Sequence, residues 1–129
     1  MKTKILHVLC EGQTEQGFVD EVLRPYLIDR GFTSVKSVLV TTNKKENAQG
    51  GMSSCTHAKL DLNLMRLSNP DSSFESHIFT TMFDFYALPN DFPGYEEASS
   101  IKEPYAHVNS LEQSFANVHI PAIAVHQFR

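Results

Sequence analysis

The stretch Leu9–Leu27, LCEGQTEQGFVDEVLRPYL, decides how this chain folds. It begins at the end of Lys4–Leu9, a largely apolar run that predicts a buried strand. Its own apolar residues then recur every three or four positions, which predicts an amphipathic helix. At the turn between strand and helix the sequence has two acids, Glu11 and Glu15, where phosphate-binding loops usually carry glycines and a lysine. The stretch is therefore a strand–turn–helix unit with an acidic turn.

The predicted helix has recognisable ends. Thr14 is the expected N-cap and Gly31 the expected stop. Pro25 lies inside the helix, lacks a backbone N–H, and is expected to kink the helix toward its end. The residues that form its one apolar face are Phe18, Val22, Leu23, Tyr26 and Leu27.

The rest of the chain alternates between strands and helices. Further strands are predicted at Val35–Val40, Ile78–Phe83 and Ile120–Val125, and further helices at about residues 55–67 and 105–118. The helix at 55–67 carries a stripe of Leu60, Leu64 and Leu67, flanked by Ala58, Leu62 and Met65. Residues 41–54 and 88–100 are predicted loops. The order β-α-β-α-β-α-β predicts a single α/β domain over residues 1–129, with a parallel four-stranded, Rossmann-like sheet flanked by helices.

Composition limits the function classes. The formal net charge of −4 argues against a free-standing nucleic-acid binder, but it leaves room for a nuclease whose acidic site reaches nucleic acid through metal ions. The two cysteines make no disulfide framework, so a cytoplasmic protein with reduced thiols is expected. The N-terminal MKTKILHVL has no signal-peptide cleavage site, and no stretch approaches the roughly 20 apolar residues of a membrane span. No membrane partner is expected.

Acidic side chains follow two of the predicted strands. Glu11 comes just after the first strand, Glu15 lies in the first turn of the next helix, and Asp84 directly follows the third strand. Ligand sites of open α/β sheets lie at the carboxyl ends of the strands, so these carboxylates are expected to meet at one edge if the first and third strands are neighbours. Carboxylate oxygens suit Mg²⁺ or Mn²⁺, and two such ions can stabilise the attacking and leaving oxygens of a phosphodiester. A metal site is therefore predicted, with Asp91 in the following loop able to approach it.

Simpler interpretations remain for the same residues. Glu15 is also explained as a first-turn acid favoured by the helix dipole, and Asp84 as a turn cap. His126 ends the fourth predicted strand at the edge where Glu11 and Asp84 lie, which makes it a further candidate. Gly50-Gly51 precedes a predicted helix and could cradle a phosphate, although a lone glycine pair is usually a flexible loop.

The acidic turn resembles a known motif. Glu11-Gly12-Gln13-Thr14-Glu15 after an apolar strand is similar to the E-G-x-x-E opening of TOPRIM domains, which occur in topoisomerases, primases and the overcoming-lysogenization-defect nucleases. More closely, nearly the whole chain resembles a bacterial family of unknown function with a TOPRIM-like core. The stretches that carry this resemblance are VLCEGQTEQGFV, QGGMS, TTMFDFYALPNDFPG and IAVHQF.

The resemblance implies roles for the acids. Glu11 corresponds to the TOPRIM glutamate that serves as acid/base or metal ligand, Glu15 to a second glutamate of the nuclease branch, and Asp84 to the first aspartate of the D-x-D metal motif. The second aspartate of that motif is Tyr86 here, and a phenol is a poor Mg²⁺ ligand. Asp91 is the expected substitute.

The C-terminal stretch departs from the family pattern as well. Gln127 stands where the family has an acid, and the chain stops soon after, at Arg129. The chain is therefore expected to be the N-terminal part of a longer TOPRIM-like family protein. Apolar surface left by a missing helix would favour a homo-oligomer.

Three functions follow from this sequence. The first is a metal-dependent, nuclease-type phosphoryl-transfer module that acts on nucleic acid and uses Mg²⁺ or Mn²⁺. The second is a non-catalytic regulatory or partner-binding module on a degenerate TOPRIM fold, working with an AAA-type or SMC-like ATPase, as the family resemblance implies. The third, a nucleotide-binding module without metal, rests only on Gly50-Gly51.

Overall fold

A parallel three-stranded sheet forms the centre of the molecule. The structure is a computed structural model, and it describes residues 2–41, 55–84 and 88–119. The strands are β1 (Thr3–Cys10), β2 (Ser34–Leu39) and β3 (Glu75–Met82), in the order β2-β1-β3. The predicted α/β class and parallel sheet are confirmed. The predicted strand Ile120–Val125 lies outside the described residues.

The register of the sheet brings the strand ends together. Cys10 at the end of β1 pairs with Leu39 of β2 on one side and with Met82 of β3 on the other, so all three strands stop level with one another. Since the strands are parallel, this level edge is the carboxyl edge of the sheet. Acids that follow β1 and β3 are therefore neighbours, as the sequence predicted.

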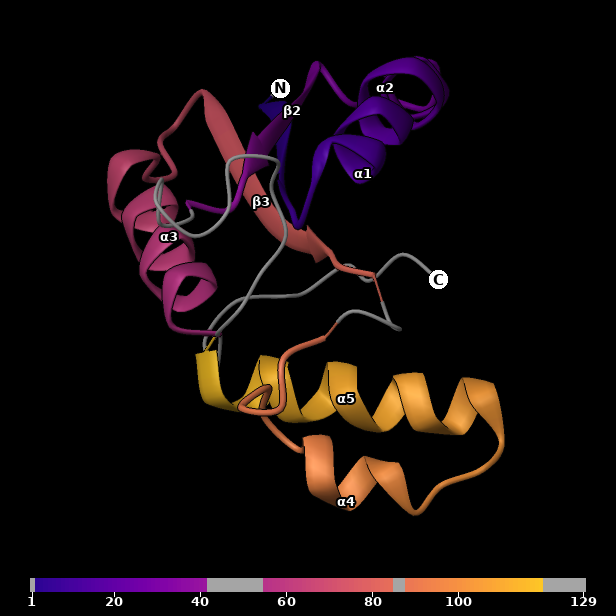
Figure 1. Ribbon diagram of the computed structural model, residues 1–129. Coiled ribbons are helices and arrows are strands. Elements are labelled where there is room, and N and C mark those ends of the chain that lie inside the picture. Colours follow the sequence, from indigo (N-terminus) through magenta and orange to yellow (C-terminus); the bar gives the residue numbers. More distant parts are fainter. Residues whose placement is uncertain (1, 42–54, 85–87, 120–129) are drawn as a thin grey trace.

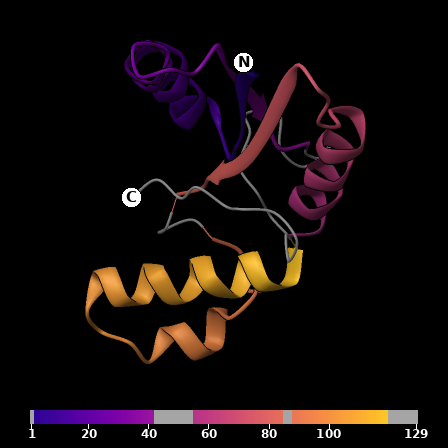
Figure 2. The ribbon, with the colours of Figure 1, turned by 180° about the vertical axis from the view of Figure 1, so that it is seen from behind.

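Helices cover both faces of the sheet and its carboxyl edge. One face carries α1 (Gln13–Phe18), the π-helical segment η1 (Val19–Leu23) and α2 (Arg24–Ile28), and the other carries α3 (Cys55–Ser68). Figures 1 and 2 show α4 (Tyr95–Ser99) and α5 (Pro104–His119) side by side, beyond the carboxyl ends of the strands. None of the helices in the described residues is long and apolar enough to cross a bilayer.

The first helix differs from its prediction in two ways. Gly12, not Thr14, is the N-cap, because the Gly12 carbonyl already accepts the first intrahelical hydrogen bond, from the N–H of Gln16. The expected disturbance at Pro25 is a widened turn: the Arg24 N–H donates to the Val19 carbonyl, five residues back, in place of an α-helical bond. Pro25 cannot donate a hydrogen bond and its ring crowds the carbonyl four residues earlier, which an ordinary α-helical turn would not accommodate.

On two helices the buried side differs from the apolar face or stripe that the spacing marked. On the first helix Val19, Leu23 and Leu27 pack against β1, whereas Phe18, Val22 and Tyr26 are exposed. On α3, Ala58, Leu62 and Met65 face the sheet, and Leu60, Leu64 and Leu67 are exposed. Each helix has apolar residues on two sides, so helical spacing alone could not tell which side meets the sheet.

The predicted loop at 88–100 contains the short helix α4. Gly94, with a left-handed φ of 77°, precedes it, and Phe92 and Ala98 anchor this segment in the core. They join Leu111 and Phe115 of α5 in one buried cluster that also contains Leu9 of β1. This cluster fastens α4 and α5 to the carboxyl edge of the sheet.

Candidate active site at the carboxyl edge of the sheet

Glu11 joins the ends of β1 and β3. Its backbone N–H donates to the carbonyl of Met82 over 3.1 Å, and its carboxylate Oε2 accepts the backbone N–H of Asp84 over 2.5 Å. The residue is 5 % exposed, which is unusual for a glutamate. A buried acid directly behind a strand and bonded to the next strand's exit is held in a defined position.

The surroundings of Glu11 favour its neutral form. Burial raises the pKa of the Glu11 carboxyl, the hydrogen bond from the Asp84 N–H lowers it, and the charges of Glu15 and Asp84 raise it again. The net direction is upward. A carboxyl with a raised pKa beside two other carboxylates is stabilised either by a proton or by a cation.

Gly12 leaves room for the Glu15 carboxylate at the turn. Its backbone is extended, with φ −149° and ψ −176°, so glycine is not needed for conformation. A Cβ at this position would lie 3.3 Å from Glu15 Oε2, which is closer than side chains normally approach. The E-G-x-x-E spacing therefore directs the Glu15 carboxylate back over the turn, toward Glu11.

Asp84 contributes a backbone N–H to Glu11 and an exposed carboxylate to the rim of the site. A role as a turn cap alone would not account for the hydrogen bond that the Asp84 N–H donates to Glu11. The chain direction that brings this N–H to the carboxylate also brings the Asp84 charge close enough to affect the pKa of Glu11. The charges of Glu15 and Asp84 thus both act on Glu11 at this edge of the sheet.

The donors at this edge are carboxylate oxygens, the kind of ligand that Mg²⁺ and Mn²⁺ prefer. Among the residues that the structure describes, no group of three or more His, Cys, Asp or Glu side chains is placed so that it could hold a metal ion. A carboxylate has about four lone-pair positions, so the hydrogen bond that the Asp84 N–H donates to Glu11 Oε2 does not use up the capacity of that carboxylate.

The Cys10 thiol next to Glu11 is buried and packs in the core. Burial, and secondarily the charges of Glu15 and Asp20, raise the pKa of Cys10 to about 12. Its Sγ lies 3.8 Å from the Val8 carbonyl, within reach of a weak hydrogen bond. A thiol that stays protonated at neutral pH is a poor nucleophile.

Among the remaining predicted residues, the structure describes Asp91. Asp91 is exposed in the turn before α4, and the carboxylates that shift the pKa of Glu11 are Glu15 and Asp84. Tyr86, Gly50-Gly51 and His126 lie outside the described residues, and their roles stay predictions.

Sequence reasoning missed a polar link behind the site. Asp20 reads as part of a solvated acidic face, but its Oδ1 is 2.7 Å from both Arg24 Nη2 and Ser37 Oγ. Arg24 Nε also donates to the Val35 carbonyl over 2.8 Å. This network fastens η1 and α2 to β2. The i, i+4 spacing of Asp20 and Arg24 was the available signal.

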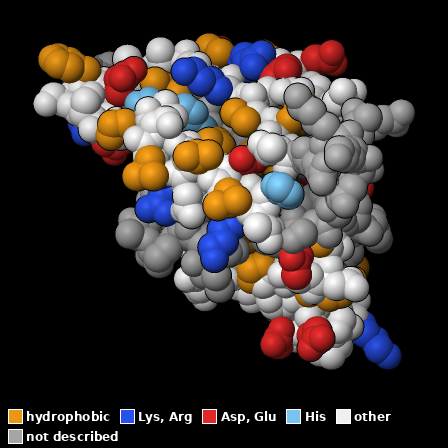
Figure 3. All heavy atoms as spheres, turned by 60° about the vertical axis from the view of Figure 1, so that its left-hand side comes forward, with side chains coloured by type: hydrophobic (Ala, Val, Ile, Leu, Met, Phe, Trp, Pro, Cys, Tyr) orange, Lys and Arg blue, Asp and Glu red, His pale blue; other side chains and the backbone are white. Residues whose placement is uncertain are grey.

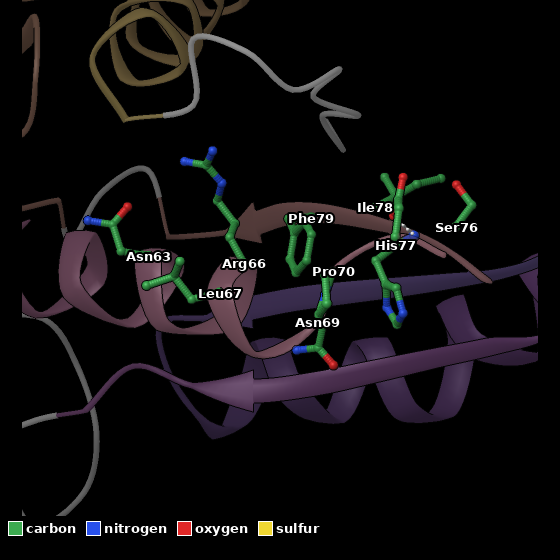
Figure 4. A pocket seen from close by; sticks show the side chains of 10 residues that line it. Asn63, Arg66, Leu67, Asn69, Pro70, Ser76, His77, Ile78 and Phe79 are labelled. Carbon is green, nitrogen blue, oxygen red and sulfur yellow. Dashed lines mark hydrogen bonds between the residues drawn. The ribbon is translucent and has the colours of Figure 1, made fainter. Parts of the chain in front are cut away.

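A second polar group was missed at the opposite end of the sheet. His7 Nε2 and His77 Nδ1 lie 2.9 Å apart, and the His7 ring stacks on both His77 and Phe79. Burial, then His77 and Lys36, lower the pKa of His7 to about 4. His77 also lines a hollow of about 690 Å³ between the start of β3 and the end of α3 (Figure 4). The two histidines are 70 positions apart, so only the strand register brings them together.

Comparison with known families places the chain. Residues 10–128 match the family model described as Domain of unknown function (DUF4276). The chain belongs to the DUF4276 family. The region matched begins at Cys10, so all three carboxylates of the DUF4276 site lie inside it. No curated protein and no solved structure matches this DUF4276 chain.

Proposed function

We propose that this DUF4276 chain is a metal-dependent, nuclease-type phosphoryl-transfer module with a TOPRIM-like core. One observation carries the proposal. The buried Glu11, fixed by the Asp84 N–H, shares the carboxyl edge of a parallel sheet with the charges of Glu15 and Asp84. This edge is where open α/β sheets bind their ligands.

The role of each acidic residue would follow from how exposed its carboxylate is. Glu15 and the exposed Asp84 would hold a Mg²⁺ or Mn²⁺ ion, and the buried Glu11 would either complete the ion's ligands or hold a proton at its carboxyl. The ion, when bound, would supply Lewis-acid stabilisation of phosphate oxygens. The protein's own part is to keep Glu11 in position through the Asp84 N–H, and to bring nucleic acid to a negatively charged edge through the ion.

A second function is favoured by a specific feature. The bond from Asp84 N–H to Glu11 joins the ends of β1 and β3, which would be a structural role for Glu11 whether or not a metal binds. With Tyr86 at the second position of the D-x-D pattern, the same edge could serve a regulatory module that binds a partner such as an AAA-type or SMC-like ATPase.

The metal is tested by thermal melting with and without Mn²⁺. At ten times its Kd, Mn²⁺ is expected to raise the wild-type Tm by about 5 °C, because binding to the folded state alone stabilises it. Asp84→Asn keeps the backbone N–H for Glu11 but removes one charge, so it should lose most of this shift and melt slightly higher without metal. Asp29→Asn is the matched control, because Asp29 is exposed at the end of α2, and this variant should respond like wild type.

Two results would decide between the functions. A wild-type Tm that is indifferent to Mn²⁺ would defeat the metal site. A Tm shift without cleavage of single- or double-stranded DNA or RNA would favour the partner-binding module, whereas cleavage that Glu11→Gln abolishes while its melting curve stays cooperative would support the nuclease.

A further inference from the structure

Helix α3 has apolar residues on two opposite sides. Ala58 and Leu62 are fully buried against the sheet. On the outer side, Leu60, Leu64 and Leu67 are 54, 60 and 80 % exposed. A helix that packs against a sheet on one side normally presents polar residues on the opposite side, so a second apolar stripe there points to a further contact. Figure 3, in which the α3 side of the molecule faces the viewer, shows hydrophobic side chains gathered there with Lys and Arg side chains beside them.

The outer leucines form a seam suited to another helix. Their spacing of four and then three residues is that of a helix pair, in which each leucine inserts between side chains of the facing helix. Phe18, Val22 and Tyr26 make a comparable stripe on the first helix, but there the Arg30 guanidinium lies over the Tyr26 ring, 3.6 Å from its centre. The α3 seam is the more exposed of the two.

The α3 seam borders the hollow described above. Asn63 and Leu67 of α3 line this hollow together with Asp71, just past the helix end. Lys59 is exposed one turn before Asn63 and therefore projects on the same flank. The surface thus has the exposed Lys59 near the start of α3 and the exposed Asp71 at the hollow near its end, where Arg66 also contributes to the lining.

If a second α3 runs antiparallel to the first, Lys59 of each helix lies near Asp71 of the other. We propose that α3 is the contact surface between two copies of this chain. The two α3 helices pack antiparallel about a two-fold axis near Leu64, and Lys59 of each copy reaches the hollow that contains Asp71 of the other. Symmetry makes this contact twice, as in other isologous dimers. A parallel pairing would place both Lys59 side chains at the same end of the contact, away from either Asp71.

The contact is expected to be modest in strength. A standard stable interface removes about 800 Å² of surface per partner, more than three leucines supply. The Lys59–Asp71 pairs lie at the rim, where charges fix orientation more than they add affinity. The dimer should therefore dissociate on dilution through the micromolar range. It leaves the carboxyl edge of each sheet outside the contact, so it does not depend on the proposed metal chemistry.

Sedimentation equilibrium over 1 µM to 1 mM, roughly the range of weak dimers, tests the seam. Wild type should shift from monomer to dimer, and Leu64→Glu should weaken the dimer at least tenfold. Val22→Glu is the matched control, because Val22 is 52 % exposed on the other apolar stripe, and it should associate like wild type. Circular dichroism checks that each variant stays folded. A wild type that stays monomeric throughout, or a Leu64→Glu chain that dimerises as wild type does, overturns the proposal.

A charge exchange tests the antiparallel geometry. Lys59→Asp alone should weaken dimerisation several-fold by placing two acids together. Adding Asp71→Lys in the same chain should restore it, since the pair is then reversed. A double variant no tighter than Lys59→Asp overturns the two-fold antiparallel arrangement.

Discussion

Acidification should unfold this protein through His7. The His7 ring is 3 % exposed, and its pKa falls from 6.5 to about 4 in the folded state because burial disfavours the charged imidazole. The unfolded chain takes up this proton near pH 6.5 and the folded chain only near pH 4. Stability is therefore complete above pH 6.5 and is lost as the pH falls toward 4. One pKa unit corresponds to about 1.4 kcal/mol, so the loss due to His7 is about 3 kcal/mol.

The measurement is the free energy of unfolding in urea between pH 7.5 and 4. His7→Gln removes the titrating ring but keeps a donor for His77 Nδ1, so this variant should be less stable at pH 7.5 and lose about 3 kcal/mol less than wild type on acidification. The charged groups that face the pair, Lys36, Glu75 and Asp71, are unchanged in the variant. His107→Gln, on α5 and outside the pair, is the control.

Glu11 acts in the opposite direction. Its pKa is raised on folding, so its contribution is fully present below its unfolded pKa and is lost as the pH rises through the folded one. The contribution of Glu11 to the pH dependence of stability is the same in wild type and in His7→Gln. It therefore cancels when the stability losses of the two proteins are compared. If the two proteins lose equal stability between pH 7.5 and 4, the account of His7 is refuted.

Three further predictions concern two glycines and the buried thiol. Gly17→Ala should stabilise the protein by about 1 kcal/mol, because a Cβ there meets nothing within 4 Å and alanine favours a helix. Gly94→Ala should destabilise it by roughly 3 kcal/mol, since φ is 77° and the new Cβ would collide with Ser114; equal urea midpoints for these two variants would contradict both statements. Iodoacetamide at pH 8 should spare Cys10 in the native protein and modify it in urea, as read by mass spectrometry of its peptide, because the pKa of Cys10 is raised to about 12. Native labelling as fast as that in urea would be inconsistent with a buried thiol.

The sequence was sufficient for the parallel sheet and for the meeting of the carboxylates. Buried strands at the start of the chain and before Asp84 are marked by apolar runs, and parallel strands necessarily end at a common edge. Placing Glu11 next to Asp84 needed only that β1 and β3 be neighbours, which the register confirms. The backbone bond between them could not be predicted, since it depends on the direction in which the chain leaves β3.

Which side of a helix is buried could not be read from its spacing. On α3 the residues Leu60, Leu64 and Leu67 repeat at helical intervals as well as Ala58, Leu62 and Met65 do, and the smaller Ala58 marks the side that comes closest to the sheet. The His7–His77 pair was invisible for another reason: the contact is set by strand register, over 70 residues of sequence. Propensity and spacing describe local structure and hold no information about register.

The widened turn at η1 has a consequence for comparing DUF4276 sequences. A π-helical turn holds one more residue than the α-helical turn it replaces, so η1 is equivalent to a single-residue insertion between Gly17 and Arg24. Deleting one residue from an α-helix rotates everything after it by about 100°. In a family member that is one residue shorter in this interval, the residue equivalent to Leu27 can face the sheet only if the helix is an uninterrupted α-helix. A gap at this place in an alignment would therefore mark a relative with an α-helical turn in place of the π-helical one, while the same core residues stay buried. The glutamates before the gap would keep their positions relative to β1.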